Sequence, residues 1–231
     1  LSVLRAGNLH RQDQVGRWGL AEPREEDDPL KLRPVMEYVL NILTGQPDQR
    51  IRIADLNDLL RQPPYGVRDG LTLVLLAAVT HIHEHELAYY EDGSFQRHII
   101  GEDFQRIVKA PGNFELQLCR VAGIRSVLFD RLLAILGLGM PSKRSSELLD
   151  IVRPLCSFAA QLPAYTHRTH ALSDLALSVR KCLLSSQDPV KLLFSELPHA
   201  CKFEPFNPDG NQNSVKEVEE YVVRLKDALD E

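Results

Sequence analysis

Long apolar runs are missing from this sequence of 231 residues. The longest nearly continuous one, residues 71–79, is much shorter than the roughly 20 apolar residues that cross a bilayer as a helix. Residues 1–17 also lack the apolar segment of a secretory signal. We therefore expect no membrane contact and a buried core helix at 71–79.

Cysteine is scarce, and the four residues, Cys119, Cys156, Cys182 and Cys201, include no CxxC pair. This spacing indicates neither a zinc knuckle nor the disulfide framework of a small secreted domain. Each cysteine lies in or after an apolar pattern, which is typical of a buried free thiol. The cysteine content thus favours a reducing cytoplasm.

The motifs of common catalytic sites are absent as well. Residues 66–72 place glycines and a threonine at a helix start, as a phosphate-binding loop does, but lack its Gly-Lys pair. The sequence has no GxSxG motif and no cysteine beside a histidine with an orienting acid. Paired carboxylates such as Glu25-Glu26 lie in charge-rich stretches, where solvation explains them. We expect no catalytic residue and no cofactor in this chain.

Three histidines are clustered between His81 and Glu86. On a helix, His81 and His85 would share a face and could chelate zinc, while His83 would point elsewhere. The metalloprotease pattern requires Glu directly after the first His, where this sequence has Ile82. No third ligand is identifiable, so a polar helix end is favoured over a metal site.

The overall composition, 44% hydrophobic and 26% charged, is ordinary for a globular protein with one large domain or two small ones. The net charge of −5 is distributed unevenly. Residues 34–100 contain five basic and nine acidic side chains, residues 101–202 contain thirteen and nine, and residues 203–231 contain three and eight. If any segment contacts a polyanion, the middle one is favoured.

Local signals between residues 34 and 100 follow the order helix, short strand, helix, helix, hairpin. Pro63-Pro64 must end a helix, and Asp92-Gly93 favours a two-residue hairpin turn. This order is that of a winged helix, a helix-turn-helix variant. The expected elements are a helix at 34–45, a strand at 51–53, helices at 54–61 and 70–86, and strands at 87–90 and 95–99.

The helix at 70–86 is apolar almost all the way round, which predicts burial on all sides. A recognition helix must instead present Arg, Lys, Asn or Gln to the DNA groove. An architectural role or a protein contact is therefore favoured over base readout. The preceding helix is expected to turn Leu56, Leu59 and Leu60 inward.

Beyond residue 100 the sequence predicts a mainly helical region. Alternation of Phe114, Leu116 and Leu118 with polar residues favours an edge strand. A helix at 148–162 must kink or restart near Pro154, because proline removes a helical hydrogen bond.

Two further helix starts have recognisable caps. Ser173 is placed to cap one helix, and Asp188-Pro189 combines a capping residue with proline at the first position. Residues 214–217 form a capping box. The helix that follows has a two-heptad apolar seam, which either docks on this chain or continues beyond it. The seam residues are Val215, Val218, Val222, Leu225 and Leu229.

Cationic and aromatic residues are densest between Tyr165 and Lys181. Phosphate contacts require such groups on one surface. A solvated helix face is the competing explanation, and the small size of the cluster favours it. The candidate nucleic-acid-binding residues are Lys143, Arg144, Arg168, Arg180 and Lys181.

Four segments, residues 1–11, 63–70, 87–95 and 192–198, resemble a region of large bacterial P-loop ATPases. Some similar ATPases lie in phage-defence gene clusters of the BREX type. The resemblance implies that the nucleotide site lies upstream of this chain and that no catalytic residue lies within it. The chain begins with Leu1 rather than Met, and we expect it to be a fragment of a longer polypeptide.

We therefore predict a mainly α protein with a small β element, comprising a winged-helix-like N-terminal part and a helical extension. The expected divisions are a partly mobile segment 1–33, a winged-helix-like domain 34–100, a helical domain with a short strand 101–213, and a coiled-coil-like helix 214–231 that could mediate self-association. The predicted function is a non-catalytic module of a larger cytoplasmic bacterial ATPase, in contact with its parent, another protein or DNA, in phage defence. The alternative is a stand-alone winged-helix protein that binds nucleic acid through the basic region 143–181.

Overall fold

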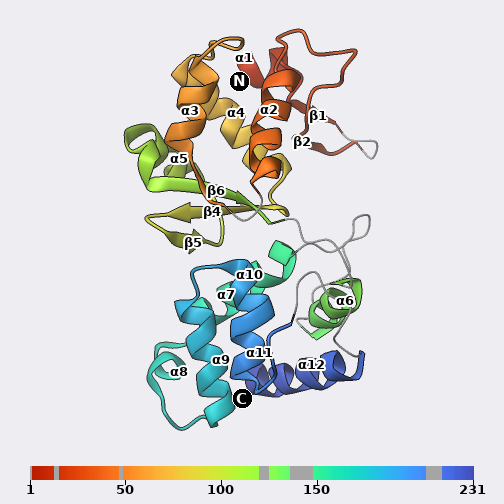
Figure 1. Ribbon diagram of the computed structural model, residues 1–231, viewed down its shortest axis with the longest axis vertical. Coiled ribbons are helices and arrows are strands. Elements are labelled where there is room, and N and C mark those ends of the chain that lie inside the picture. Colours follow the sequence, from red (N-terminus) through yellow and green to blue (C-terminus); the bar gives the residue numbers. More distant parts are fainter. Residues whose placement is uncertain (1, 13–15, 47–48, 120–124, 136–147, 207–214) are drawn as a thin grey trace. The chain divides into compact units, whose positions relative to one another are not determined.

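The computed structural model describes residues 2–12, 16–46, 49–119, 125–135, 148–206 and 215–231 (Figure 1). As predicted, the protein is mainly helical with a small antiparallel β element. No helix among these described residues is long and apolar enough to span a bilayer.

Contacts divide the chain into two compact units. Unit 1 contains Leu1–Gly93 and Ile99–Leu118, and unit 2 contains Ser94–His98 and Cys119–Glu231. Unit 1 therefore extends past the boundary that we expected at residue 100, because its sheet includes a strand that ends at Leu118. The expected domain divisions stay predictions.

Unit 1 opens with helix α1 (Ser2–Ala6) and a hairpin of strands β1 (His10–Gln12) and β2 (Trp18–Leu20). Gly7 follows α1 in a tight space, where a Cβ would lie 2.4 Å from the Cδ1 atom of Leu32. Asn8 then adopts left-handed backbone angles (φ 52°), which redirect the chain into β1. The first 33 residues thus contain more regular structure than we expected.

Unit 1 continues with helices α2 (Arg33–Gly45), α3 (Ile53–Arg61) and α4 (Asp69–Ile82). Asp28 fixes the start of α2, because its carboxylate accepts hydrogen bonds from the amides of Leu32 and Arg33. Such first-turn amides have no partner within the helix. An apolar stripe of α2 is buried at Met36, Val39 and Leu43.

Helix α3 corrects one expectation. Leu56 and Leu60 are fully buried, but Leu59 remains 37% exposed. The buried face of α3 is set by Ile53, Leu56 and Leu60, and Leu59, about 100° round the helix from Leu60, lies at its edge. The helix ends before Pro63-Pro64, as predicted, and Arg61 binds Asp69 at 2.6 Å, which joins α3 to the start of α4.

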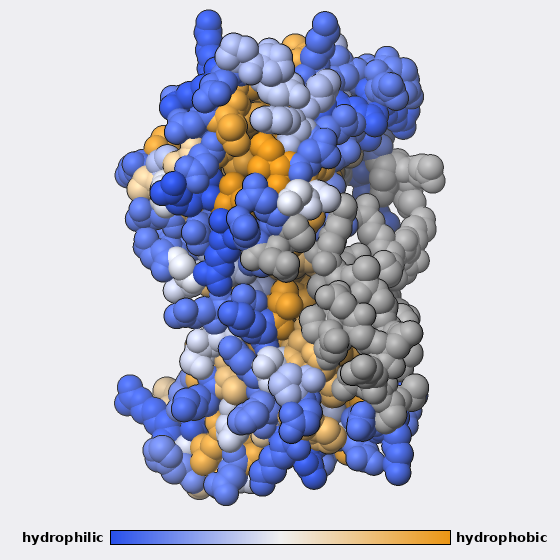
Figure 2. All heavy atoms as spheres, viewed as in Figure 1, coloured by the Kyte–Doolittle hydropathy of each residue, from blue (hydrophilic) through white to orange (hydrophobic). Residues whose placement is uncertain are grey.

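Helix α4 ends at Ile82 rather than at residue 86, and the prediction of burial on all sides is wrong. Leu75 and Leu76 are buried, whereas Leu73 and Val74 are only partly covered. Figure 2 shows apolar side chains at the surface of unit 1 between α2 and α3. One face of α4 thus supports the core, and the other contributes to a partly open surface.

The larger sheet contains β3 (Ile51–Arg52), β4 (Leu87–Glu91), β5 (Ser94–Gln96) and β6 (Phe114–Leu118) in the order β3-β6-β4-β5. The prediction that residues 114–118 form an edge strand is wrong, because β6 lies between β3 and β4. The polar residue Gln117 of β6 is buried, like its apolar neighbours. Its side-chain oxygen accepts a hydrogen bond from the Tyr90 hydroxyl at 2.7 Å, which provides this buried oxygen with a partner. The turn between β4 and β5 is the predicted one, with positive φ at Asp92 and Gly93.

Helix α5 (Gly101–Lys109) and a 3₁₀ turn, η1 (Pro111–Asn113), lead into β6. Asp103 accepts a hydrogen bond from the Ile100 amide at 2.7 Å and so caps the helix start. Arg106 binds Glu91 at 2.7 Å, which joins α5 to β4. The hydrogen bond from Arg106 lowers the pKa of the Glu91 carboxyl group.

Unit 2 contains α6 (Arg125–Ile135), α7 (Leu148–Gln161), α8 (Ala164–Arg168), α9 (Asp174–Ser185) and α12 (Val215–Asp230). Helix α7 continues through Pro154 without restarting. The predicted cap of α9 is confirmed, because the Ser173 hydroxyl accepts a hydrogen bond from the Ala176 amide at 3.2 Å.

A composite helical segment follows α9: α10 (Pro189–Lys191), a π-helical turn η2 (Leu192–Glu196) and α11 (Leu197–Ala200). Asp188 caps it as predicted, accepting hydrogen bonds from the Val190 and Lys191 amides at 3.0 Å. Pro198 has no amide to offer the Phe194 carbonyl four residues earlier. The Phe206 amide bonds that carbonyl at 2.7 Å instead, which secures the chain after α11.

Helix α12 packs against α6 and α9. Tyr221 and Leu225 are fully buried, and Val218 and Val222 are nearly so. Of the two outcomes that we left open for this seam, docking on the same chain is the observed one. Ser214 of the predicted capping box lies outside the described residues, and self-association stays a prediction.

Candidate nucleic-acid interface

The five predicted basic residues lie in different settings. Lys143 and Arg144 fall outside the described residues. Arg168 is exposed at the end of α8, and Lys181 is exposed on α9. Arg180, although adjacent to Lys181, is partly buried.

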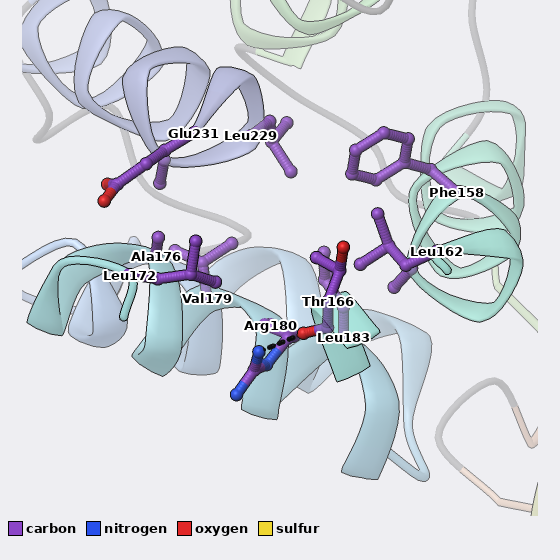
Figure 3. Close-up of a pocket in the computed structure, with 12 residues that line it drawn as sticks. Phe158, Leu162, Thr166, Leu172, Ala176, Val179, Arg180, Leu183, Leu229 and Glu231 are labelled. Carbon is purple, nitrogen blue, oxygen red and sulfur yellow. Dashed lines mark hydrogen bonds between the residues drawn. The ribbon is translucent and has the colours of Figure 1, made fainter. Parts of the chain in front are cut away.

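Arg180 joins α9 to the end of α8. Its guanidinium group donates a hydrogen bond to the Thr166 carbonyl (Figure 3) and another, at 3.0 Å, to the Thr169 carbonyl. Carbonyls at a helix C-terminus lack intrahelical partners and favour a positive charge. N–H groups of Arg180 that could bind a phosphate are thus directed to backbone carbonyls of the same chain.

Beside Arg180 lies a small apolar pocket between α7, α9 and α12 (Figure 3). Phe158, Leu162 and Leu229 point into this space. Its volume is about 40 Å³, whereas small-molecule sites enclose roughly 300–1,000 Å³. The pocket is therefore a packing defect at the helix junction rather than a ligand site.

The histidine cluster is arranged differently from the expected helix end. Because α4 stops at Ile82, His83 follows the helix, and its Nε2 atom lies 2.9 Å from a carboxylate oxygen of Glu22. His81 and His85 lie near Glu84, at 3.9 and 3.5 Å. In the part of the chain that the structure describes, no three His, Cys, Asp or Glu side chains are grouped as metal ligands.

The glycine-containing segment before α4 makes ordinary local contacts. Gly66 has a positive φ of 58°, and the Thr72 hydroxyl bonds to the Arg68 carbonyl at 3.3 Å. That contact occupies the hydroxyl that a phosphate loop would direct to a metal ion.

Three of the four thiols are buried as predicted, whereas Cys182 is partly exposed. Burial raises the pKa of Cys156 to about 11 and that of Cys201 to about 12. Because the thiolate is the reactive form, these cysteines are poor nucleophiles at neutral pH.

The β1–β2 hairpin presents the most distinctive surface of unit 1. His10 is paired with Leu20, Arg11 with Gly19, and Gln12 with Trp18. Side chains of directly paired residues lie on the same face of a sheet, and alternate residues share a face. His10, Gln12 and Trp18 therefore lie on one face, and Arg11 on the other.

On the first face, the rings of His10 and Trp18 stack with centroids 5.0 Å apart and planes inclined by 19°. Trp18 is 63% exposed and His10 is exposed too. A large aromatic surface that meets water rather than a core is unusual, and such surfaces mark interaction sites.

Arginines surround this stack, which we call the aromatic stack of the hairpin. An open hollow of about 950 Å³ runs along its face, and its lining includes Arg5, Arg11 and no acidic residue among those described. A second hollow, of about 840 Å³, is lined by Arg11, Arg17, Arg24 and one carboxylate, that of Glu84. Positive groups thus lie on both sides of the exposed rings.

The base of the hairpin is anchored in unit 1. Leu9 is fully buried, Leu20 packs against the core, and the Ala21 amide bonds to the Leu9 carbonyl at 2.9 Å. Strand β2 also packs on α4. The contact of Glu22 with His83 adds a charged link, and the hydrogen bond from His83 lowers the pKa of Glu22 against the effect of burial.

Sequence reasoning missed this surface, since it assigned residues 1–33 to a weakly organised segment. The available signal was the single tryptophan of the chain, placed among Arg5, Arg11, Arg17 and Arg24. The arginines lie six or seven residues apart, which matches neither a helix nor a strand period. Only the fold brings them around one pair of rings.

Comparison of the chain with models of protein families, with curated proteins and with solved structures found no match. The candidate interface therefore depends on its own geometry.

Proposed function

We propose that this chain is a non-catalytic contact module and that its partner is nucleic acid, bound at the β1–β2 hairpin. The observation that carries the proposal is the aromatic stack of the hairpin, with Trp18 63% exposed and arginines on either side. Arginine supplies the salt-dependent attraction to phosphates, and exposed rings supply contacts to bases.

The wider context of the chain is proposed from its sequence. The resemblance to bacterial P-loop ATPases supports a role within a larger ATPase of that kind, including those of phage defence. The series α2, β3, α3, α4, β4, β5 supports a winged-helix-like arrangement of residues 34–100, with β6 added between β3 and β4. The free cysteines support a cytoplasmic setting.

Base readout by α4 has no support, because its middle is apolar and largely covered. A recognition helix needs polar side chains that reach base edges. The hairpin, not the third helix of the winged-helix order, is the surface that we assign to nucleic acid.

The test is the affinity of the 231-residue chain for a labelled DNA oligonucleotide, measured by fluorescence anisotropy between about 50 and about 200 mM salt. We expect binding that weakens steeply with salt. The double variant Arg5→Glu, Arg11→Glu should weaken it by about tenfold or more, because each arginine that faces a phosphate releases counterions on binding. An affinity that changes neither with salt concentration nor with these substitutions would refute the proposal.

The second candidate is nucleic-acid binding through the basic region 143–181. It is favoured only by the exposure of Arg168 and Lys181, because Arg180 is engaged with backbone carbonyls. The double variant Arg168→Glu, Lys181→Glu is thus the matched control for the hairpin variant. A larger loss of affinity in this control would favour the second candidate.

A further inference from the structure

We infer that the hairpin binds single-stranded nucleic acid, with an unpaired base stacked on the exposed face of Trp18. The inference rests on the proposed function and deepens it, since it names the form of the ligand. It depends on how the aromatic stack is built, on which groups lie beside it, and on the apolar character of α4.

The aromatic stack is a preformed platform. Only one face of the Trp18 ring can be occupied by His10, whose plane is inclined by 19° at a centroid distance of 5.0 Å. Trp18 as a whole nevertheless remains 63% exposed. A flat aromatic ring already held parallel to a neighbour can receive a base on its open side with little loss of side-chain freedom.

The sugar-phosphate backbone of the bound nucleic-acid strand can also be contacted at this surface. Arg5 and Arg11 line the hollow along the stack, and Asn8 and Gln12 add amide groups to the same lining. Arginine can bind phosphate through two parallel hydrogen bonds. Aromatic rings for bases beside cations for phosphates are the combination found in proteins that bind single strands.

A duplex fits this surface less well. In a duplex both faces of each base are covered by the neighbouring base pairs, so Trp18 could stack only on a terminal pair. Proteins that read duplex DNA place polar side chains of a helix or ribbon in a groove, and the central residues of α4 are apolar. The hairpin should therefore prefer unpaired nucleotides.

The preference can be measured with the whole chain. Trp18 is the only tryptophan, so intrinsic fluorescence reports this site alone. We expect an oligothymidine of about 12 nucleotides, within the size range of single-strand sites, to quench the tryptophan emission. The same sequence in a duplex should bind more weakly and quench less.

Two substitutions test stacking directly, with labelled oligonucleotides and anisotropy as the readout. Trp18→Ala should weaken single-strand binding by about 5- to 100-fold, the range seen for loss of one stacked base, and Trp18→Phe should restore part of it. Tyr165→Ala is the matched control, because Tyr165 is 76% exposed in unit 2 and lies in the region of the second candidate rather than at the hairpin. Circular dichroism checks that each variant is folded.

The outcomes separate the inference from the proposed function. A single-strand preference that Trp18→Ala abolishes and Tyr165→Ala leaves intact would support stacking. Equal affinity for both forms, unaffected by Trp18→Ala but reduced by Arg5→Glu with Arg11→Glu, would overturn the inference and leave the proposed function standing. Absence of salt-dependent binding to either form would overturn both.

Discussion

The arginines beside the aromatic stack, Arg5 and Arg11, and Arg180 in unit 2 are the same residue type in opposite situations. Arg180 donates to the carbonyls of Thr166 and Thr169 and is partly buried. Arg5 and Arg11 line an open hollow beside exposed aromatic rings. The density of basic residues along the sequence pointed to the region of Arg180, whereas the open hollow beside the exposed rings supports the hairpin as the proposed interface. An arginine that donates to its own backbone is a weaker candidate for phosphate binding than one that lines an open surface.

The largest effect should come from removing Arg180. Arg180→Ala leaves two carbonyls at the end of α8 without their charged partner, and hydrogen bonds to charged groups contribute roughly 1.5–3 kcal/mol. We expect the free energy of unfolding of unit 2 to fall by about 2 kcal/mol, measured by urea denaturation. Arg168→Ala is the control and should change stability by no more than about 0.5 kcal/mol. Equal effects of the two variants would remove the structural distinction between Arg180 and its neighbours.

Substitution of Arg5 and Arg11, beside the hairpin, is expected to change DNA binding and to leave stability unchanged. Arg5→Gln with Arg11→Gln should leave the free energy of unfolding within about 0.5 kcal/mol of the parent. It should reduce the slope of log affinity against log salt for DNA by up to about two, one for each arginine that no longer neutralises a phosphate. A salt titration by anisotropy measures the slope. An unchanged slope would show that these arginines do not face phosphates.

A smaller effect is expected at the cap of α9. Ser173→Ala removes the hydroxyl that accepts from the Ala176 amide, and loss of such a cap costs about 1 kcal/mol. Ser173→Asp, which restores a capping oxygen, should recover part of this loss, although its charge would lie near the Glu231 carboxylate. Thermal unfolding by circular dichroism can rank the three proteins. If Ser173→Ala unfolds at the same temperature as the parent protein, the start of α9 is held by other contacts.

The smallest effect concerns the anchor of the hairpin. The folded protein holds the pKa of Glu22 below its ordinary value of 4.5, first through the hydrogen bond from His83. The stabilisation is therefore present above pH 4.5 and is lost as the pH falls through the lowered value. Glu22→Gln should cost less than about 1 kcal/mol at neutral pH, and the difference should shrink below about pH 4.

Urea unfolding at several pH values provides the measurement for this anchor. Glu26→Gln is the control, because Glu26 is exposed on the same loop. A difference between Glu22→Gln and the parent protein that stays constant down to about pH 3 would exclude the ionised carboxylate as its cause.

Much of the fold could be predicted because its signals are local. The Asp92-Gly93 turn, the Ser173 cap and the Asp188-Pro189 start each depend on a few adjacent residues, and all three are confirmed. The place of β6 in the sheet could not be predicted in this way. Its partner Ile51 is distant in sequence, and burial of Gln117 depends on a hydrogen bond from Tyr90.

The candidate site was hidden for a related reason. Nothing in the order of residues shows that Arg180 is turned to the end of α8, or that His10 and Trp18 stack across two short strands. Both arrangements depend on how the backbone places one helix or strand beside another. Composition could identify the residue types of an interface, but it could not show which arginines remain accessible.

The central position of β6 has a consequence for how the chain is made. Strand β3 has no neighbour in its sheet, among the described residues, other than residues 114–118. A ribosome releases the chain from its N-terminus, so Ile51 must wait unpaired until that later segment has emerged. An exposed strand edge invites wrong partners during such a delay. Strand β3 has only two residues, so its unpaired edge offers few backbone groups with which another chain could pair.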